Sequence, residues 1–439
     1  MNEIQEAPQI IRDNRSLASI SKSANRPVTA NRKHEMIEIR EALQIIRDNH
    51  PQPEVATLPL LDALGRRIAM DIPAPEPSPR YTNSAMDGFA VRWEDVATVA
   101  GGDLITLAIA GESQAGIPFS GTCRAGQAIK ISTGAMLPEG TDTVVRVEDT
   151  QTEDNRITVL QARKKGQDIR RAGEEFAAGE LLLPQGTALQ APQLGLLTSV
   201  GINQVAVYSP PHVSLVVTGT ELAAPDEPVA PHQIRDSNSI MLTAAVRQAG
   251  GEVVARNYTG DTSSDTVAAI KKSIEKTGIV IVTGGVSVGE HDHVKEAARE
   301  CGFVELFWRV RQKPGKPLFF ARKDDCLLFG LPGNPVSGFM CFMYYIQPLL
   351  RGLQGRDFSW RTAKARFDNS VKNKESRTNF MRIALRKEES GFMIAEVLPK
   401  QGSHMLGSIA RADGFIIVEP GQSISEGSWQ DVYLFPWRM

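Results

Sequence analysis

The sequence predicts a multidomain protein that combines one α/β domain with two smaller β-rich domains. First, 439 residues exceed the size of one ordinary domain, so about two to four domains are expected. Second, apolar strand-like runs alternate with helix-like segments between residues 213 and 350, and repeated units of this kind favour a mostly parallel, doubly wound sheet. Third, short strand-like runs separated by glycine turns fill residues 77–160 and the stretch after Gly355, which is typical of β-rich domains.

A repeat occupies the first residues of the chain. Residues 3–14 recur at residues 38–49 with two differences, one of which places Pro8 where the second copy has Leu43. A proline inside a helix costs about 3 kcal/mol, so the first copy forms the poorer helix. Residues 16–33 are rich in Ser, Asn, Arg and Lys and offer little to bury. We predict that residues 1–35 are a disordered, duplicated extension and that folding begins at Met36; a functional N-terminal arm is the alternative.

Between residues 36 and 200 the pattern runs from helix to strands and back to helix. Residues 36–48 carry apolar side chains at helical spacing, and residues 72–75 (IPAP) are typical of a stiff, extended connector. Strand-like runs then follow at residues 104–110, 127–131, 143–147 and 156–160. Residues 191–200 predict a helix again, because Pro192 is tolerated in a first turn.

From residue 213 onward, strands and helices alternate. Helices are predicted at residues 239–249, with Ser237 or Asn238 as the cap, and at 264–276, 293–300 and 336–350. Strands are predicted at residues 213–217, 253–258, 279–282 and 304–308, with further extended pieces at 318–320 and 327–331. In a doubly wound sheet, ligands bind beyond the carboxyl ends of the strands. Thr218, Asp261, Gly284 and Gly333 all fall there.

Two glycine-bearing loops directly follow predicted strands. Residues 283–292 (TGGVSVGEHD) come after one apolar run, and residues 331–338 (LPGNPVSG) come after another. Glycines let backbone N–H groups approach an anion closely, and Glu290 and Asp292 can hold a balancing cation. The pattern indicates a phosphate-containing ligand, although neither loop is a Walker or Rossmann fingerprint. His291, His293 and His404 show no ligand spacing, so we interpret them as solvated or hydrogen-bonded.

The composition argues against several classes of protein. The formal net charge of -2 provides no field for nucleic acid or a membrane surface. The four cysteines are scattered, which disfavours a structural zinc site or a disulfide framework and favours a reducing cytoplasm. No apolar run reaches the roughly 18 to 20 residues of a membrane span. The N-terminus is charged where a secretory signal would be apolar.

Seven short motifs occur in the order in which one enzyme family carries them. They are residues 83–90 (NSAMDGFA), 132–135 (STGA), 169–175 (IRRAGEE), 218–222 (TGTEL), 284–292 (GGVSVGEHD), 313–317 (KPGKP) and 331–335 (LPGNP). From about Met36 to the C-terminus, the chain closely resembles the molybdopterin molybdenumtransferases, the MoeA and gephyrin E-domain family.

The resemblance implies an elongated, four-domain chain that dimerises. Residues 36–76 and 167–207 would form a linker and dimerisation domain, with residues 77–166 inserted as a β-rich domain. Residues 208–353 would be a molybdopterin-binding-like α/β domain, and residues 354–439 a small β-barrel domain.

The resemblance also implies a reaction. Family members bind adenylylated molybdopterin, insert molybdate into its dithiolene as substrate and release AMP, assisted by Mg²⁺. Carried over by motif, the catalytic residues would be Asp87, Thr133, Glu175, Glu221, Asp261 and Asp292, and the metal ligands among them Glu221, Asp261 and Asp292. The substrate-binding residues would be Gly284, Gly285, Ser287, Gly333, Asn334, Lys313, Lys316, Arg382 and Ser403, of which the three cations and Ser403 would face molybdate.

The partners that the resemblance implies are proteins and small molecules of one cytoplasmic process. Besides adenylylated molybdopterin and molybdate, they are a second copy of the chain, the molybdopterin adenylyltransferase and molybdoenzyme chaperones. Neither nucleic acid nor a membrane is expected.

Two positions depart from the family's pattern. Thr220 stands where an aspartate is common, and threonine keeps an oxygen but loses the charge, so a cation contact there would be weaker. Glu175 replaces a usual aspartate and keeps the charge with a longer reach.

Simpler interpretations exist for several candidate residues. Asp87 beside Gly88 can form a turn, Asp261 and Asp292 can cap helices, and Lys313 and Lys316 can lie on a solvated loop. The long apolar helix at residues 336–350 is interpreted as core.

Two other functions compete with metal insertion. One is a different nucleotide-handling enzyme on the same α/β module, such as an adenylyltransferase, although that branch lacks the loop at residues 83–90 and the C-terminal β domain. The other is a non-catalytic scaffold, which is disfavoured because residues 1–35 are too few for a fused partner domain.

Overall fold

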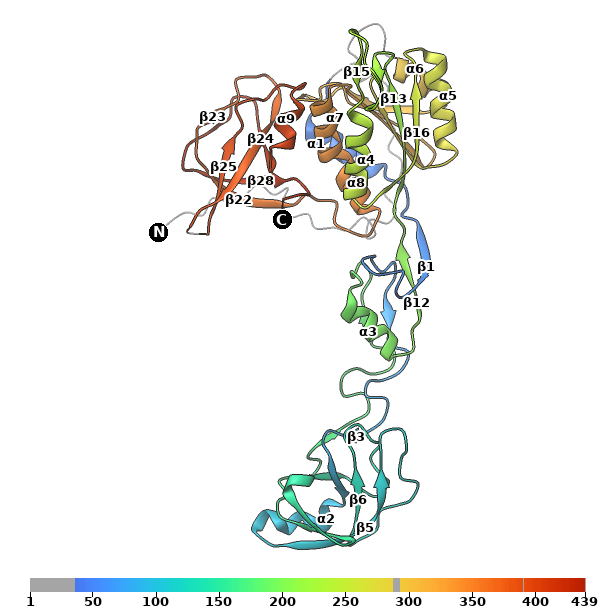
Figure 1. Ribbon diagram of the computed structural model, residues 1–439, viewed down its shortest axis with the longest axis vertical. Helices are drawn as coiled ribbons and strands as arrows, with labels where there is room; N and C mark the ends of the chain where they lie inside the picture. Colours follow the sequence, from blue (N-terminus) through green and yellow to red (C-terminus); the bar gives the residue numbers. More distant parts are fainter. Residues whose placement is uncertain (1–35, 287–292, 390, 439) are drawn as a thin grey trace. The chain divides into compact units, whose positions relative to one another are not determined.

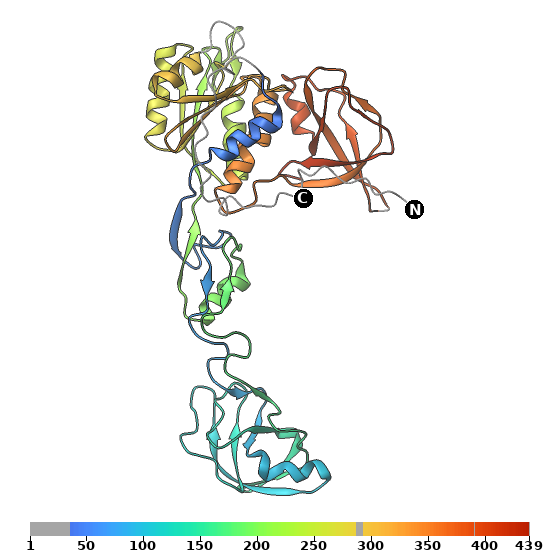
Figure 2. The ribbon, with the colours of Figure 1, turned by 180° about the vertical axis from the view of Figure 1, so that it is seen from behind.

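The computed structural model describes residues 36–286, 293–389 and 391–438. The predictions made for residues 1–35, Ser287 and Asp292 therefore lie outside the described residues. The chain divides into two compact units, which we describe one at a time: the second comprises Leu58–Val205, and the first comprises the described residues on either side of it. Figures 1 and 2 show both units, coloured along the sequence.

A six-stranded sheet with the order β16-β13-β17-β21-β20-β18 forms the centre of the α/β part of the first unit. β13 (His212–Thr218) pairs in parallel with both β16 (Glu252–Thr259) and β17 (Ile279–Thr283). β17 in turn pairs in parallel with β21 (Cys326–Leu331). The mostly parallel sheet is confirmed, and the four parallel strands end at one common edge.

The last two strands of this sheet run antiparallel. β20 (Phe319–Lys323) pairs antiparallel with β21, and β18 (Val304–Trp308) pairs antiparallel with β20. Only Asp324 and Asp325 connect β20 to β21, and Asp324 has a φ of 50°. Such a short connection with positive φ makes a hairpin, which forces the antiparallel direction.

Helices cover both faces of the sheet, as a doubly wound fold requires. In β17, Val280 and Val282 face the core beneath α5 and α6, whereas Ile281 faces the core beneath the other helices. Figure 1 shows α5 and α6 on one side of the sheet and α4, α7 and α8 on the other. The helices are α1 (Ile39–Asp48), α4 (Asn238–Gln248), α5 (Ser263–Ile274), α6 (His293–Glu300), α7 (Pro335–Cys341) and α8 (Gln347–Gly352).

The predicted continuous helix at residues 336–350 is interrupted. A π-helical segment, Phe342–Ile346, separates α7 from α8. Pro348 stands in the first turn of α8, where its missing N–H removes one helical hydrogen bond and its ring crowds the preceding turn. All three segments are buried, so the interpretation of this stretch as core is confirmed.

A closed β-barrel follows in the same unit. Its sheet has the order β19-β24-β25-β22-β28-β26, and an additional pairing of β24 with β26 closes the ring. Ile383, Phe367, Val418 and Val432 are among the side chains that fill it. The strands are β19 (Gln312–Lys313), β22 (Thr362–Phe367), β24 (Thr378–Lys387), β25 (Met393–Val397), β26 (Gly414–Val418) and β28 (Trp429–Leu434), with the pair β23 (Val371–Lys372) and β27 (Ser423–Ile424) and the short helix α9 (Leu406–Ala410) beside them.

The second unit is built on another six-stranded sheet, with the order β7-β4-β6-β5-β9-β8. Its core includes Phe89, Leu107 and Val145. The short helix α2 (Trp93–Val96) and a 3₁₀ turn were not predicted, because so short a segment carries no helical period. The strands are β4 (Gly88–Val91), β5 (Ile105–Ser113), β6 (Gln127–Ile131), β7 (Thr143–Arg146), β8 (Thr150–Glu153) and β9 (Arg156–Val159).

Short two-stranded ladders and one helix complete the chain. α3 (Ala191–Ser199) begins with a capping box between Gln190 and Gln193. The ladders pair β1 (Val55–Pro59) with β12 (Gln204–Tyr208), β2 (Ile72–Pro73) with β11 (Leu181–Leu183), β3 (Asn83–Ser84) with β10 (Ile169–Arg170), and β14 (Leu222–Ala223) with β15 (Ile234–Arg235).

Two further observations concern the class of protein. Within the described ranges, no helix combines the length and the apolar character that crossing a bilayer demands. The four cysteines are unpaired, and three of them are buried.

Candidate functional site

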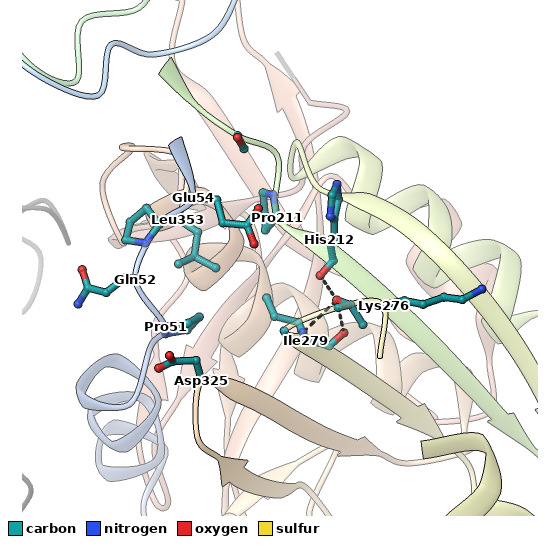
Figure 3. A pocket seen from close by; sticks show the side chains of 13 residues that line it. Pro51, Gln52, Glu54, Pro211, His212, Lys276, Ile279, Asp325 and Leu353 are labelled. Carbon is teal, nitrogen blue, oxygen red and sulfur yellow. Dashed lines mark hydrogen bonds between the residues drawn. The ribbon is translucent and has the colours of Figure 1, made fainter. Parts of the chain in front are cut away.

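One pocket of the first unit lies away from the predicted ligand edge. Its volume is about 430 Å³. His212 and Ile279, which begin β13 and β17, line it together with Asp325, which precedes β21, so it opens at the amino ends of the strands (Figure 3). The Thr277 hydroxyl inside it is already hydrogen-bonded to the backbone of His212 and Ile279. None of the residues predicted to be functional lines this pocket.

At the opposite edge, where both glycine loops were predicted, the first residues of the two loops contact each other. The backbone N–H of Gly284 donates to the carbonyl oxygen of Leu331 over 3.2 Å. Gly284 has a φ of 88°, and a Cβ built there would lie 2.5 Å from the carbonyl oxygen of Thr218. Only glycine fits such a position, so the ends of β13, β17 and β21 come together because residue 284 has no side chain.

Asn238 ties these two loops together, a role that the sequence did not reveal. Its Nδ2 donates to Thr283 Oγ1 over 3.0 Å and to the carbonyl oxygen of Gly333 over 2.8 Å. We had predicted a cap for α4 at Ser237 or Asn238. Ser237 is the N-cap residue, as one of the two alternatives predicted, but its side chain makes no capping hydrogen bond. The side chain of Asp236 takes that role, and its Oδ1 accepts from the backbone N–H of Ser239 over 3.1 Å.

Asp261 and Thr220 form the acidic part of the same edge. Asp261 Oδ2 accepts from both the backbone N–H and the Oγ1 of Thr220, over 2.9 and 3.1 Å. The proposal that Asp261 caps α5 is wrong, because the Thr262 side chain is the cap and accepts from Asp265. Thr220 therefore orients the Asp261 carboxylate, and Asp261 Oδ1 forms no hydrogen bond with the described residues.

The carboxylate of Glu221 folds back toward Gly219, since a Cβ on that glycine would lie 2.8 Å from Glu221 Oε2. Within the described ranges, no cluster of three or more His, Cys, Asp or Glu side chains could hold a metal ion. The third predicted ligand, Asp292, lies outside those ranges.

A buried hydrogen-bond network shapes the loop that carries Lys313 and Lys316. Gln312 is fully buried; its Nε2 donates to the carbonyl oxygen of Gly315 over 3.0 Å, and its Oε1 accepts from the hydroxyl of Tyr345 over 2.5 Å. Burial raises the pKa of the Tyr345 hydroxyl well above its ordinary value, so it remains a donor. Buried hydrogen bonds therefore fix the conformation of this loop, so it is more than a solvated connection.

Arg382 is the most enclosed cation of the candidate site. Its side chain, on β24, is 1% exposed, and no Asp or Glu of the described residues forms an ion pair with it. Its Nη2 lies 3.5 Å from each of the carbonyl oxygens of Lys400 and Gly402, and its buried Nε has no partner in the described part of the chain. Burial lowers the pKa of Arg382 to about 10, so the guanidinium stays charged near neutral pH.

Ser403 and Asn334 lie next to this arginine. Asn334 Nδ2 is 3.5 Å from Ser403 Oγ, and Ser403 follows Gly402, whose carbonyl faces Arg382. The structure thus brings three of the predicted substrate-binding residues together where the second glycine loop meets the barrel.

Asp87 and Thr133 meet in the second unit. Asp87 Oδ1 accepts from the backbone N–H of Thr133 over 2.7 Å, a contact across 46 positions of sequence that a simple Asp-Gly turn does not explain. A Cβ on Gly88 would lie 2.1 Å from the carbonyl oxygen of Val145, so this glycine lets the Asp87 loop lie against β7. Glu175 is bonded elsewhere, accepting from Ser78 Oγ over 2.7 Å.

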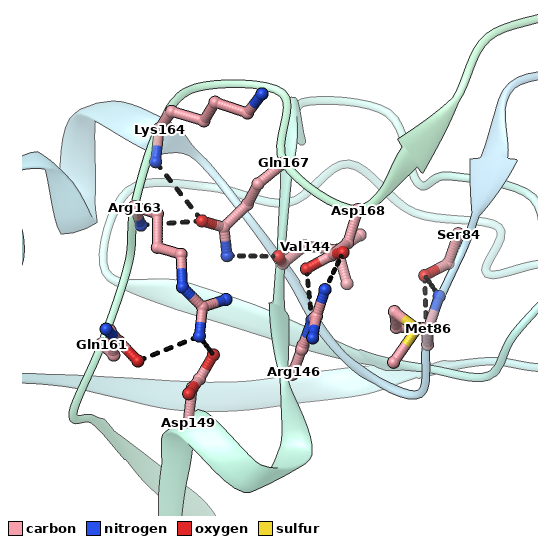
Figure 4. Close-up of polar contacts among 10 residues, drawn as sticks. All are labelled: Ser84, Met86, Val144, Arg146, Asp149, Gln161, Arg163, Lys164, Gln167 and Asp168. Carbon is pink, nitrogen blue, oxygen red and sulfur yellow. Dashed lines mark hydrogen bonds and ion pairs between the residues drawn. The ribbon is translucent and has the colours of Figure 1, made fainter.

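An ion pair supports the Asp87 loop and was not predicted (Figure 4). Arg146 Nε and Nη2 donate to Asp168 Oδ2 and Oδ1 over 2.9 and 2.8 Å. The carbonyl oxygen of Asp168 accepts from the backbone N–H of Ala85 over 2.8 Å. Ser84 Oγ donates to the carbonyl oxygen of Met86 over 2.6 Å. Side chains at residues 146 and 168 thus hold the loop that carries Asp87.

Sequence models of one family match three stretches of the chain. They are the "MoeA N-terminal region (domain I and II)" at residues 37–201, the "probable molybdopterin binding domain" at residues 214–352 and the "MoeA C-terminal region (domain IV)" at residues 364–435.

Individual relatives agree with these matches. The molybdopterin molybdenumtransferase of Haemophilus influenzae is 36% identical over 366 residues, which cover 82% of this chain and 89% of that protein. The molybdopterin molybdenumtransferase of a Nostoc species is 34% identical over 385 residues, covering 86% and 88%. The crystal structure of a molybdopterin biosynthesis MoeA protein from Pyrococcus horikoshii superposes with a TM-score of 0.81 at 29% identity, covering 91% of this chain and 99% of that one.

The doubly wound sheet, the glycine loops that begin at its carboxyl edge and the C-terminal β-barrel together define a protein with a molybdopterin-binding type of α/β domain. The chain belongs to the MoeA family of molybdopterin molybdenumtransferases.

Proposed function

We infer that this chain inserts molybdate into adenylylated molybdopterin, releases AMP and so completes the molybdenum cofactor. The observation that carries this inference is Arg382, a buried cation without a carboxylate partner among the described residues. Leaving a buried charge uncompensated is costly, so a site of this kind is suited to receive an anion from outside. The relatives named above act as molybdenumtransferases, and molybdate is a dianion of the required kind.

The remaining candidate residues take roles that their chemistry supports. We propose that Lys313, Lys316, Arg382 and Ser403 bind molybdate, because cations and a hydroxyl donor suit a compact oxyanion. The backbone N–H groups of the glycine loops, at Gly284, Gly285 and Gly333, would bind the phosphates, with Ser287 and Asn334 as hydroxyl and amide donors. Asp87, Thr133 and Glu175 are proposed as polar residues of the same reaction.

We propose Mg²⁺ as the cofactor, with Glu221, Asp261 and Asp292 as its ligands. Carboxylate oxygens are the donors that Mg²⁺ prefers, and Asp261 keeps Oδ1 available because Thr220 occupies only Oδ2. When bound, the ion would neutralise phosphate charge as AMP leaves. Thr220 supports this arrangement by fixing one oxygen of Asp261.

The proposed setting is a cytoplasmic homodimer that receives its substrate from the molybdopterin adenylyltransferase and passes its product to molybdoenzyme chaperones. Light scattering of the purified chain would establish its oligomeric state. Co-purification with the adenylyltransferase would test the first of these partners.

The central experiment is cofactor reconstitution with the purified chain, adenylylated molybdopterin and a titration of molybdate. A charge-assisted contact contributes about 1.5 to 3 kcal/mol, so Arg382→Ala should raise the half-saturating molybdate concentration by about tenfold or more. Arg386→Ala is the matched control, because Arg386 lies on the same strand but is exposed and paired with Asp368. A wild-type chain that consumes adenylylated molybdopterin without needing molybdate would refute the proposed function.

A further inference from the structure

Lys313 does not face an empty site: it is already paired with a carboxylate. Its Nζ lies 2.7 Å from Glu375 Oε1, and both side chains are 43% exposed. The hydrogen bond from Lys313 holds the pKa of Glu375 below its ordinary value, so this carboxylate is ionised near neutral pH.

Glu375 is held in place by its loop. The backbone N–H of Glu375 donates to Oδ1 of Asn373, which is 1% exposed. The Asn373 Nδ2 donates in turn to the carbonyl oxygens of Arg377 and Val418, over 2.9 and 2.8 Å. A buried asparagine with three satisfied hydrogen bonds fixes the backbone from which the Glu375 carboxylate projects.

The same loop is fastened to the segment that carries Lys313. Arg377 Nη1 donates to the carbonyl oxygen of Gln312 over 3.3 Å, and the backbone N–H of Thr378 donates to that of Arg311 over 3.2 Å. β19 and β24 pair directly, with Lys313 opposite Asn379. The contact between Lys313 and Glu375 therefore joins two backbone segments that are hydrogen-bonded to each other.

The other two cations of the proposed molybdate set have no such partner. Neither Lys316 nor Arg382 forms an ion pair with any Asp or Glu in the described ranges. An incoming oxyanion would therefore meet two cations without a carboxylate partner and one that is already paired.

We propose that Glu375 is a built-in counter-anion that competes with molybdate for Lys313 and thereby sets the affinity of the site for its oxyanion. The inference rests on the proposed role of Lys313 as a molybdate ligand. The exchange is non-covalent: the Lys313 ammonium leaves the Glu375 carboxylate and engages a molybdate oxygen, and the carboxylate is released to water. No proton or electron is transferred.

The competition lowers the affinity of the site for anions that contact Lys313 alone. An anion that reaches only Lys313 must displace a fixed carboxylate, whereas molybdate can also contact Arg382 and Lys316. Glu375 thus disfavours ligands that cannot use all three cations, which is discrimination by a repulsive element.

The test is a molybdate titration of the insertion reaction with the full chain and the variants Glu375→Gln, Lys313→Ala and the double variant. Exposed ion pairs are weak, so Glu375→Gln should lower the half-saturating molybdate concentration by no more than about fivefold, with the maximal rate unchanged. Lys313→Ala should raise it by about tenfold. In the double variant, the glutamine should have no further effect, because its target is gone.

Asp368→Asn is the matched control. Asp368 pairs with Arg386 over 2.7 Å in the same barrel and is similarly exposed, so this substitution changes the net charge equally. It should leave the molybdate titration unchanged. The effect of Glu375→Gln should also shrink at high ionic strength, because salt screens exposed charges.

Each outcome decides one assignment. If Lys313→Ala raises the molybdate requirement but Glu375→Gln leaves it unchanged or raises it, the counter-anion proposal is wrong and the role of Lys313 stands. If Lys313→Ala has no effect, Lys313 is not a molybdate ligand and the inference falls with that assignment. A wild-type chain that inserts no molybdate would instead refute the proposed function itself.

Discussion

Replacing Asn238 with alanine should weaken substrate binding as well as the fold. The substitution removes two hydrogen bonds, to Thr283 Oγ1 over 3.0 Å and to the carbonyl oxygen of Gly333 over 2.8 Å. Each such bond contributes about 0.5 to 1.5 kcal/mol net, so the loss should be about 1 to 3 kcal/mol. Both bonds end on the glycine loops, so the loss falls on the geometry of the proposed phosphate site.

The assay is a pair of measurements on the full chain. Urea unfolding, followed by a signal from the α/β part, gives the change in stability, and the insertion reaction gives the KM for adenylylated molybdopterin. Asn257→Ala is the control, because Asn257 makes one hydrogen bond of 3.0 Å, to Ser273 in the same α/β part, and touches neither glycine loop. If about half of the lost 1 to 3 kcal/mol falls on binding, Asn238→Ala should raise the KM for adenylylated molybdopterin by about two- to tenfold. Asn257→Ala should leave it unchanged.

Two results would contradict this prediction. The first is an Asn238→Ala variant whose KM for adenylylated molybdopterin equals that of the wild type while its stability falls, which would make Asn238 purely structural. The second is an equal rise in KM for Asn257→Ala, which would show that any local loosening of the α/β part has the same effect.

The remaining predictions concern the residues behind the two groups of site residues. Tyr345→Phe leaves the buried Gln312 Oε1 without its hydrogen-bond donor, which should cost about 1 to 3 kcal/mol of stability and raise the molybdate requirement through the Lys313 loop. Tyr344→Phe is the control, because no hydrogen bond of the Tyr344 hydroxyl is found in the described part of the chain. Equal unfolding midpoints for the two variants would contradict this prediction. Asp168→Asn should weaken the bidentate contact with Arg146, in which Asp168 is 12% exposed, and should lower the insertion rate through the Asp87 loop. Asp149→Asn is the control and should not change the rate, because Asp149 pairs with Arg163 over a longer distance of 3.3 Å. Burial raises the pKa of the Cys341 thiol to about 12, so the folded chain binds the thiol proton more tightly than the unfolded chain does. The stability that this group contributes is complete below its ordinary pKa and is lost as the pH rises above about 9. Cys341→Ser should flatten that part of a curve of unfolding free energy against pH.

Local sequence patterns were sufficient to predict most helices and strands of the central α/β sheet. Apolar runs ended by glycine located β17 and β21 to within a residue or two, because strand ends and turns are encoded by neighbouring residues. The antiparallel direction of β18 and β20 was missed, since pairing partners leave no local period. The π-helical interruption was also missed, although Pro348 was visible, because apolar periodicity continued through it.

The candidate site was predictable only where a motif could be carried over. Arg382, Ser403 and Asn334 were named from motifs, and the structure brings them together. Asn238 could not be found in this way, because its two contacts lie 45 and 95 positions away. In the sequence alone, a polar residue where a helix begins cannot be told apart from a cap. Glu375 could not be predicted from the sequence either, because a single acidic residue in a polar loop gives no indication that it pairs with Lys313.

The cations of the site are compensated in two different ways, and the difference follows from burial. Arg382 is enclosed, so desolvation alone lowers its pKa to about 10, and the charged form destabilises the folded chain at any pH below that value until an anion arrives. Lys313 is half-exposed, so water and Glu375 can share its charge at little cost. A dianion that binds both cations therefore gains most of its binding free energy from Arg382. It loses a small part of the contribution from Lys313, because Glu375 competes for that cation. On this argument Arg382 supplies most of the affinity for the oxyanion, and Glu375 adjusts it.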